Sequence, residues 1–252
     1  MTVPDFKVFR PEAAALATPG QLPDGGVGTS VRVAEVTAEH DMAVELPLPL
    51  HLLGPAGTVS VQLRTMLRRV AMGAGLARRS ELVAAVQAVP NLPGLVSSPA
   101  GGTFVIGGDH WLGVAAIGKP PPGDALALDW MVRALQGWFN KRLGAVGVSV
   151  ELGRVEGAWC PGFSDLSVRG RKLVGLGFRV TRDWVVMRGV FAVQPLDDAD
   201  LALLTALHAL IGVDVVRSAN TSLAEETGDS SWTAERVIAL LSGEDHPVLA
   251  EA

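Results

Sequence analysis

The sequence predicts an α+β protein, within the broader α/β class, with a central mixed and largely antiparallel sheet flanked by helices. Short apolar strands separated by glycine-bearing turns begin near residue 94, and long amphipathic segments lie between and after them. A chain of 252 residues with 48% hydrophobic residues can bury a substantial core. We expect an irregular segment over residues 1–28, rich in Pro, Gly and Ala, followed by a single domain over residues 29–252.

Helices are predicted where apolar residues recur every three or four positions. The clearest pattern covers residues 124–143, directly after a Lys-Pro-Pro-Pro-Gly run that ends any preceding element. Residues 198–211 and 232–241 predict two further helices near the end of the chain. Helical spacing also covers residues 59–71 and 80–89, so we expect two helices before the strands begin.

Strands are predicted where short runs of β-branched and other apolar residues lie between turn residues. These runs cover residues 95–98, 103–106, 111–117, 146–150 and 184–193. Together with the helices they favour an antiparallel sheet over the regular strand–helix alternation of a parallel one.

A β-hairpin is predicted directly after Cys160, the only cysteine of the chain. Its strands cover residues 164–168 and 171–180, and Arg169-Gly170 forms a two-residue turn. In this register Ser167 lies opposite Lys172.

Asp165 lies diagonally across from Lys172, roughly 7–8 Å away on the same face of the hairpin. A lysine side chain can span that distance. Simple alternation along the second strand also places three apolar side chains on the Lys172 face: Val174, Leu176 and Phe178.

Cys160, Lys172 and Asp165 together suggest acyl transfer. A cysteine thiolate can hold an acyl group as a reactive thioester, and a neighbouring lysine can orient the acyl carbonyl or manage a proton. Asp165 would fix the position of the lysine. The alternatives are a cysteine packed as a small hydrophobic residue, a solvated strand lysine and an ordinary turn carboxylate.

The run GRKLVG over residues 170–175 resembles a Gly-Arg-Lys signature of the biotin/lipoate protein ligase superfamily. The preceding CPGFSDLS over residues 160–167 is similar to the cysteine loop of its octanoyltransferase branch, whose members move octanoyl groups from the glycine cleavage H protein to other lipoyl domains. Residues 98–105 resemble the substrate loop of the family, and residues 221–225 resemble a helix start near its C-terminus. The resemblance covers roughly residues 90–230.

This resemblance implies a ligase-like catalytic domain in which Cys160 carries the acyl group. The two glycines of the substrate loop bring backbone amides close to an acyl carbonyl, unless they only form a hairpin turn. The expected substrate-binding residues are Ala100, Gly101, Gly102, Thr103, Gly175 and Arg179.

The chain departs from the family pattern in two places. Ser98 or Pro99 stands where the family has an arginine in the substrate loop, and Phe178-Arg179-Val180 replaces a Gln-Arg-Arg run after the lysine strand. Because Ser98 and Pro99 offer no cation, we expect a preference for a neutral, apolar acyl chain.

Three functions agree with these residues. The first is transfer of an octanoyl or lipoyl group, through a thioester on Cys160, to a lysine of a lipoyl carrier domain, with an acylated carrier such as the glycine cleavage H protein as donor. The second is an ATP-dependent lipoate or biotin protein ligase, in which Lys172 contacts the acyl-adenylate. The third is a divergent, non-catalytic paralogue that binds the acyl ligand or the carrier domain.

Composition argues against several other classes of protein. The net charge of −5 and the absence of a dense basic cluster argue against nucleic acid as a partner. A single cysteine fits a reducing compartment, and no secretory signal or membrane span is visible, so we expect a cytoplasmic protein that does not bind membranes.

Neither a metal nor a cofactor is expected, since no glycine-rich phosphate loop and no metal-ligand spacing occurs in the sequence. Asp109-His110 is a further candidate for activating a thiol, with a surface turn as its alternative. The other four histidines, which include His208, show no metal spacing and receive no role.

Overall fold

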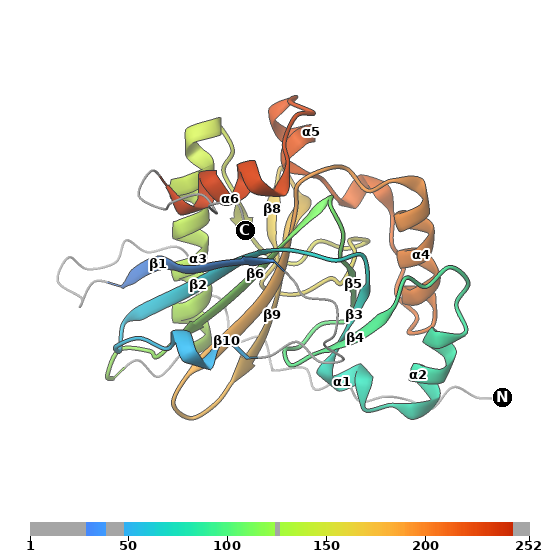
Figure 1. Ribbon diagram of the computed structural model, residues 1–252, viewed down its shortest axis with the longest axis horizontal. Coiled ribbons are helices and arrows are strands. Elements are labelled where there is room, and N and C mark those ends of the chain that lie inside the picture. The colour runs from blue at the N-terminus through green and yellow to red at the C-terminus, as the bar shows by residue number, and fades with distance from the viewer. Residues whose placement is uncertain (1–28, 39–47, 124–126, 244–252) are drawn as a thin grey trace.

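The computed structural model describes residues 29–38, 48–123 and 127–243 (Figure 1). Residues 1–28, predicted to be irregular, lie outside the described residues. The described chain contains a large mixed sheet and a small sheet with helices packed on both sides, which confirms the predicted α/β class.

The large sheet has seven strands, and only its first pair is parallel. Their order across the sheet is β1 (Ser30–Ala38), β2 (Thr58–Thr65), β6 (Trp111–Gly118), β10 (Val185–Ala192), β9 (Arg171–Val180), β8 (Leu166–Val168) and β7 (Glu151–Leu152). In the small sheet the central strand pairs in parallel with one neighbour and antiparallel with the other. Its order is β4 (Leu95–Ser98), β3 (Val70–Gly73) and β5 (Phe104–Ile106).

Six α-helices and three short 3₁₀ helices occur in the described residues. The α-helices are α1 (Ala74–Ala77), α2 (Ser80–Gln87), α3 (Ala127–Leu143), α4 (Asp198–Ala209), α5 (Leu223–Thr227) and α6 (Ala234–Ser242). The 3₁₀ helices are η1 (Leu50–Leu52), η2 (Gly144–Val146) and η3 (Arg217–Ala219).

The large sheet is covered on both faces. Helices α3 and α6 lie on one face, and the small sheet with α1, α2 and α4 lies beyond the other (Figure 1). A Cβ at Gly118 of β6 would lie 2.7 Å from the ring of Trp130 in α3, whereas one at Gly177 of β9 would lie 2.3 Å from the Gly101 carbonyl oxygen between β4 and β5. Both layers therefore approach the sheet where it lacks side chains.

Most of the predicted elements are confirmed, but the helix predicted over residues 59–71 is wrong. These residues form most of β2 and the start of β3. In β2, Val59, Val61 and Leu63 alternate with polar residues that are also buried, among them Ser60 and Arg64. Because both faces of the sheet are covered, burial shows no period of two along the strand, and the apolar residues matched a helical spacing by chance.

Two smaller differences concern strands. Residues 146–150, predicted as a strand, end a 3₁₀ helix and continue as irregular chain into the short β7. Strand β1 was not predicted at all. The predicted hairpin is present as β8 and β9, and its turn residues Arg169 and Gly170 have φ values of 50° and 74°, as a two-residue turn of type I′ requires.

A β-bulge on β9 changes which residues share a face with Lys172. Ser167 pairs with Lys172 as predicted, but Leu166 pairs with Val174, so that Leu173 is an extra residue in β9. Beyond the bulge the alternation is reversed, and a Cβ at Gly175 would lie 2.9 Å from Cε of Lys172. The prediction that Val174, Leu176 and Phe178 share the Lys172 face is therefore wrong, because glycines take that place.

Candidate active site

Lys172 is completely buried and lies among three oxygen atoms. Its Nζ donates hydrogen bonds to the carbonyl oxygens of Trp159 (2.8 Å) and Cys160 (2.6 Å). The carboxylate of Asp165 lies 2.9 Å from the same nitrogen, and the ammonium also lies 4.1 Å from the centre of the Trp159 ring. Lys172 thus contacts Cys160 at the backbone carbonyl oxygen.

The amide groups of Trp159 and Cys160 are also bound by side chains. The Trp159 N–H donates to Oδ1 of Asn220 (3.1 Å), and the Cys160 N–H donates to Nε2 of His208 (3.0 Å). All four polar backbone groups of this dipeptide therefore bind side chains from other parts of the chain. Cys160 itself has a φ of 44°, in the left-handed region that a residue with a side chain adopts only under constraint.

The Cys160 sulfur faces the loop between β4 and β5. The Thr103 N–H donates a hydrogen bond to Sγ at 3.0 Å, and the Thr103 hydroxyl lies 2.9 Å from Nε2 of His208. Gly102 has a φ of 113°, and a Cβ at this position would lie 3.1 Å from Sγ. The loop thus brings bare backbone against the thiol.

His208 is fully buried in the last turn of α4 and is the histidine that contacts Cys160. Its Nδ1 lies 2.8 Å from the Leu204 carbonyl oxygen, which can only accept, so Nδ1 carries the proton and Nε2 is the acceptor. Burial lowers the pKa of His208 to about 4, and the positive charge of Lys172 adds to this effect. The imidazole is therefore neutral at physiological pH.

Sequence reasoning missed His208 because it asked only for metal spacing. The signal was its place on the apolar stripe of a predicted helix, four residues after Leu204 and next to Leu207, which predicts burial. The candidate chosen from the sequence, His110, lies beside Asp197 and Asp200 at the start of α4 instead.

Asp165 is almost entirely buried and faces Lys172. Burial raises the pKa of its carboxyl group, against the lowering effects of the Lys172 ammonium and of the Gly162 N–H, which donates a hydrogen bond at 2.8 Å. The carboxylate therefore holds both the lysine and the Cys-Pro-Gly turn. This contact confirms the predicted approach of Asp165 to Lys172.

A small cavity of about 50 Å³, partly open to solvent, lies between the large sheet and the small sheet. Cys160 and Trp159 form part of its wall, and backbone at several glycines forms much of the rest. The lining residues are Arg64, Met66, Ala71, Gly73, Ser98, Gly101, Gly102, Thr103, Val105, Trp159, Cys160, Gly175, Leu176, Gly177, Arg188, Gly189 and Val190.

Four of the six predicted substrate-binding residues line this cavity, namely Gly101, Gly102, Thr103 and Gly175. Ala100, in the same loop, is buried and is not among the lining residues, and its N–H donates to the Ser98 hydroxyl (3.3 Å). Arg179 is exposed near the end of β9 and is not among the lining residues. The structure therefore gives no support for a role of Arg179 in binding substrate.

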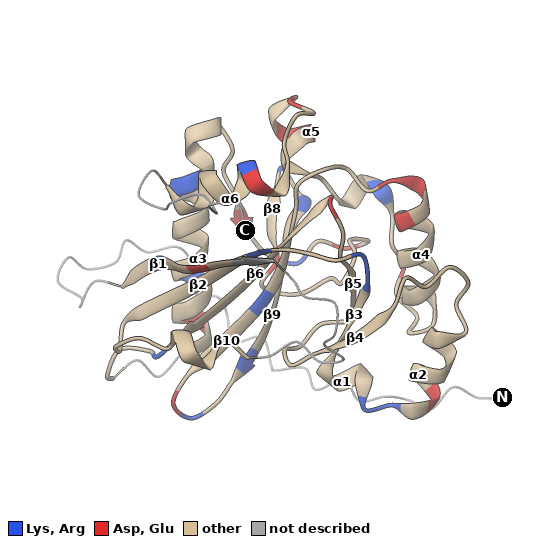
Figure 2. Cartoon of the chain, viewed as in Figure 1, with Lys and Arg blue, Asp and Glu red and all other residues tan. Residues whose placement is uncertain are grey.

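Two buried arginines line the cavity, although the loop between β4 and β5 carries none. Arg64 of β2 and Arg188 of β10 are each 7% exposed. A Cβ at Gly113 of β6 would lie 2.6 Å from Nε of Arg64, so the glycine lets this side chain cross the neighbouring strand. Ser98 and Pro99 offer no cation, as expected, but two arginines reach the cavity from the large sheet. Figure 2 shows basic residues on the central strands of the fold.

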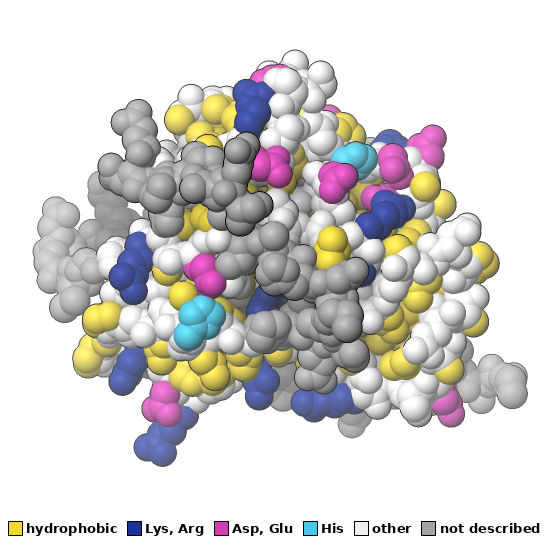
Figure 3. Space-filling view, viewed as in Figure 1, with side chains coloured by type: hydrophobic (Ala, Val, Ile, Leu, Met, Phe, Trp, Pro, Cys, Tyr) yellow, Lys and Arg dark blue, Asp and Glu magenta, His cyan; other side chains and the backbone are white. Residues whose placement is uncertain are grey.

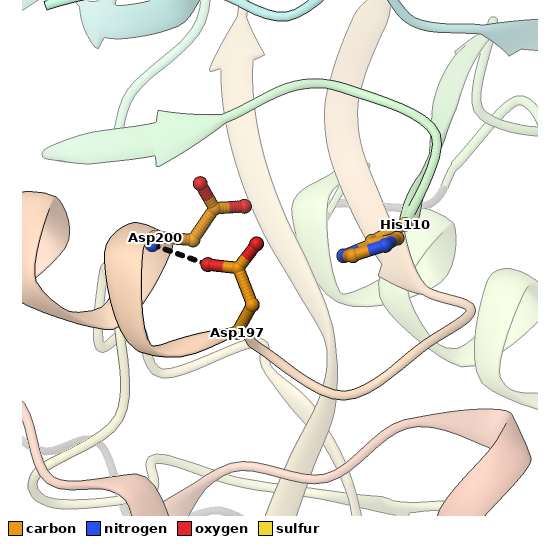
Figure 4. A group of neighbouring side chains, drawn as sticks. All are labelled: His110, Asp197 and Asp200. Carbon is orange, nitrogen blue, oxygen red and sulfur yellow. Dashed lines mark hydrogen bonds between the residues drawn. The ribbon is translucent and has the colours of Figure 1, made fainter. Parts of the chain in front are cut away.

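His110, Asp197 and Asp200 form a cluster of metal-ligand type, the one such cluster in the described part of the chain (Figure 4). The Asp197 carboxylate accepts the Asp200 N–H (2.6 Å) and so caps α4. The buried carboxylate of Asp200 lies 2.6 Å from the Arg68 guanidinium. The cap and the ion pair account for both carboxylates.

The surface is of mixed charge where it is described. On the face shown in Figure 3, basic and acidic side chains are interspersed among apolar and neutral ones. Across residues 29–38, 48–123 and 127–243, no helix has the length and apolar character needed to cross a membrane.

Comparison with known proteins gives one related sequence and several similar folds. No protein-family model matches the chain. Over 150 residues the chain is 27% identical to the octanoyl-[GcvH]:protein N-octanoyltransferase of Geobacillus kaustophilus (strain HTA426), covering 56% of this chain and 53% of that protein. The match thus spans about half the length of the curated relative.

Solved structures that share the fold include two ligases. Lipoate-protein ligase A bound with ATP is 14% identical, with a TM-score of 0.51 over 73% of this chain and 70% of that one. P. falciparum LipL1 in complex with lipoate is 12% identical, with a TM-score of 0.51 over 84% of this chain and 60% of that one. The predicted ligase-like architecture is confirmed.

The first prediction concerns the buried ion pair. Lys172→Met and Asp165→Asn should each lower the free energy of unfolding by about 3–5 kcal/mol, because each leaves the partner buried without its counterpart. The double variant should cost less than the sum of the two, since it leaves no uncompensated charge. Urea unfolding measures all three, and strictly additive losses would contradict the pairing. As a control, Arg133→Met breaks an exposed pair with Asp129 and should cost about 0.5 kcal/mol or less.

The second prediction concerns pH. The pKa of His208 is about 4 in the folded protein against 6.5 for the free side chain, so the unfolded chain binds the proton more tightly. The stability from the neutral imidazole is complete above pH 6.5 and is lost as the pH falls towards 4. Between pH 7 and pH 5 this loss should be about 2 kcal/mol. In urea unfolding, the free energy of unfolding of His208→Gln should lack this part of the pH dependence. If it falls as steeply with pH as that of the native chain, His208 is not the group responsible.

The third prediction concerns access to the thiol. Gly102→Val should block reaction of Cys160 with iodoacetamide, because the new side chain begins 3.1 Å from Sγ. The positive φ adds strain of about 1–3 kcal/mol, which should leave the fold intact. Gly147→Val is the matched control, since Gly147 has a φ of 75° and a Cβ added there would have no atom within 4 Å. Intact-mass spectrometry follows both reactions. Equal alkylation of the two variants would show that iodoacetamide reaches Sγ from a side other than that of Gly102.

Proposed function

Because the chain shares its fold with lipoate-protein ligases and part of its sequence with an octanoyltransferase, we propose that it is an acyltransferase that carries an octanoyl or lipoyl group on Cys160. The observation that carries the proposal is the position of the thiol. Sγ lies at the wall of the cavity, accepts the Thr103 N–H at 3.0 Å and is held by a loop that three distant side chains anchor. Such a constrained cysteine is more than a packing residue.

The proposed reaction has two balanced halves. In the first, Sγ attacks the carbonyl carbon of an acyl-lysine amide on the donor, the C–N bond breaks, and the thiol proton leaves on the donor amine. In the second, the amine of an acceptor lysine attacks the thioester carbonyl, the C–S bond breaks, and the proton returns to sulfur. Neither half consumes a nucleotide.

Lys172 serves this reaction by holding the nucleophile. Its ammonium binds the Trp159 and Cys160 carbonyls and the Asp165 carboxylate, so its contacts lie within the protein. We expect it to fix the Cys160 loop and to place positive charge beneath the site where negative charge develops. This replaces the expectation that the ammonium itself handles the acyl carbonyl.

The acyl chain would lie in the cavity between the two sheets. Gly175 and Gly177 line the cavity on β9, and Val105, Met66 and Val190 supply apolar walls. A slot of this kind suits a flexible acyl chain better than a rigid ring system. The guanidinium groups of Arg64 and Arg188 would contact the part of the acyl chain that extends to them.

The proposed partner is a lipoyl-type carrier domain that presents a lysine to the cavity. The curated relative is named for transfer from GcvH. On this chain Phe163, three residues after Cys160, is 72% exposed, and the Arg154 guanidinium lies 5.6 Å from its ring centre. An exposed aromatic side chain beside the thiol loop is a suitable contact for a protein substrate.

The fourth prediction tests this function. Octanoylated H protein, mixed with the chain without ATP, should give an octanoyl adduct that intact-mass spectrometry assigns to Cys160. Cys160→Ser should form no thioester and should lose transfer to an apo lipoyl domain by about a thousandfold or more. An ATP-dependent ligase would keep its activity in this variant, and a binding protein would keep its affinity while the native chain formed no adduct. Either result would overturn the proposal.

A further inference from the structure

We propose that His208 is a positioning residue for the thioester chemistry, and that it aligns the Thr103 N–H with the Cys160 sulfur as a donor for the developing oxyanion. Nothing in the sequence pattern gives this histidine a role. The alignment of the Thr103 N–H with the sulfur rests on geometry alone. The role of this N–H as a donor to the oxyanion rests on the proposed function.

One imidazole nitrogen joins three separate parts of the fold. Nε2 of His208, at the end of α4, accepts the Cys160 N–H at 3.0 Å and lies 2.9 Å from the Thr103 hydroxyl. Since Nε2 carries no proton, the hydroxyl is the donor. The same nitrogen therefore ties the cysteine loop to the loop between β4 and β5.

This tie closes a small triangle of contacts. The Thr103 hydroxyl donates a hydrogen bond to His208, and the Thr103 backbone N–H donates one to the Cys160 sulfur at 3.0 Å. The Cys160 backbone N–H in turn donates a hydrogen bond to His208. The two loops are 57 residues apart in sequence, so the sulfur meets this N–H only if both loops are held in register. The imidazole supplies that register from a buried, fixed position.

The helix prepares the imidazole for this task. The Leu204 carbonyl oxygen, one turn earlier in α4, accepts a hydrogen bond from the Nδ1–H at 2.8 Å and so fixes the tautomer in which Nε2 is the acceptor. Phe104 packs edge-on against the ring at 5.5 Å, which limits its rotation. Of the charged groups nearby, Lys172 acts on the imidazole electrostatically and disfavours a second positive charge.

The chemical consequence concerns the tetrahedral intermediate. When Sγ attacks an acyl carbonyl, negative charge develops on the carbonyl oxygen beside the sulfur. This oxygen lies within reach of the Thr103 N–H, which donates to the sulfur before the attack. Gly102, with no side chain, leaves room there for the oxygen. A donor that is already in place needs no reorganisation when the charge forms.

The experiment compares His208→Leu with His208→Gln and, as control, His51→Leu. Leucine removes the acceptor, whereas the glutamine side-chain oxygen can reach the position of Nε2 and accept in its place. His51 is largely exposed and pairs with Glu35, so the control removes a histidine at a distance from the thiol contacts. Two rates are followed by intact-mass spectrometry: iodoacetamide alkylation of Cys160 at fixed pH, and octanoyl loading from octanoylated H protein.

His208→Leu should lower kcat of loading about 100-fold with little change in KM, because a misplaced donor affects mainly the transition state. Alkylation should slow about tenfold, since the N–H that stabilises the thiolate is displaced. His208→Gln should recover most of both rates. A His208→Leu protein with native alkylation overturns the proposal, as does a loss that glutamine leaves unrescued.

The two halves remain separable. If the native chain takes up no acyl group, the proposed function fails, and alkylation alone decides whether His208 aligns Thr103 with the sulfur. If His208→Leu does not fold, Thr103→Val replaces it, because valine keeps the backbone N–H but removes the hydroxyl that binds Nε2. Thr103→Ser keeps the hydroxyl and is its matched control. Equal alkylation of the valine and serine variants would then overturn the proposal.

Discussion

The site depends on one constraint, the fixing of the Trp159–Cys160 backbone outside any regular element. A buried peptide group without a hydrogen-bond partner costs free energy comparable to a lost hydrogen bond. Because this dipeptide lies in no strand or helix, regular backbone pairing does not supply its partners. Lys172 binds both carbonyls, and Asn220 and His208 each bind one N–H. Because every polar group is bound, Cys160 can remain in a left-handed conformation that would otherwise relax.

The charges around this dipeptide are arranged so that they do not compete. Lys172 and Asp165 compensate each other at 2.9 Å inside the protein, and their pairing offsets much of the cost of burying either one. His208 is neutral because burial and the nearby ammonium oppose a second positive charge. A neutral imidazole can accept hydrogen bonds at Nε2, which a protonated one cannot, so the charge on Lys172 and the acceptor role of His208 support each other.

Glycines decide how closely the layers approach around the cavity. A Cβ at Gly73 would lie 2.1 Å from the Gly102 carbonyl oxygen, and one at Gly177 would lie 2.3 Å from that of Gly101. The loop between β4 and β5 is thus held between β3 and β9 by backbone packed on backbone, with Gly102 directed at the thiol. Arg64 crosses Gly113 for the same reason, which brings a cation into a cavity whose own loop has none.

The sequence by itself determined the hairpin, the helices α2, α3, α4 and α6, and the pairing of Asp165 with Lys172, because these follow from turn chemistry and from periodic patterns over a few residues. Through a resemblance it also singled out the loop of Gly101 and Gly102, whose contact with the thiol only the structure shows. It misassigned β2, where both faces are buried and the period of two disappears.

Only the tertiary structure decided the rest of the site. His208, Asn220 and Thr103 meet Cys160 and its neighbour Trp159 across separations of 48 to 61 residues, and Arg64 and Arg188 reach the cavity from strands on either side of β6. The bulge at Leu173 then turns glycines, not apolar side chains, towards Lys172. No local pattern encodes such contacts, because they depend on how the sheets pack and on a single extra residue that reverses the alternation of a strand.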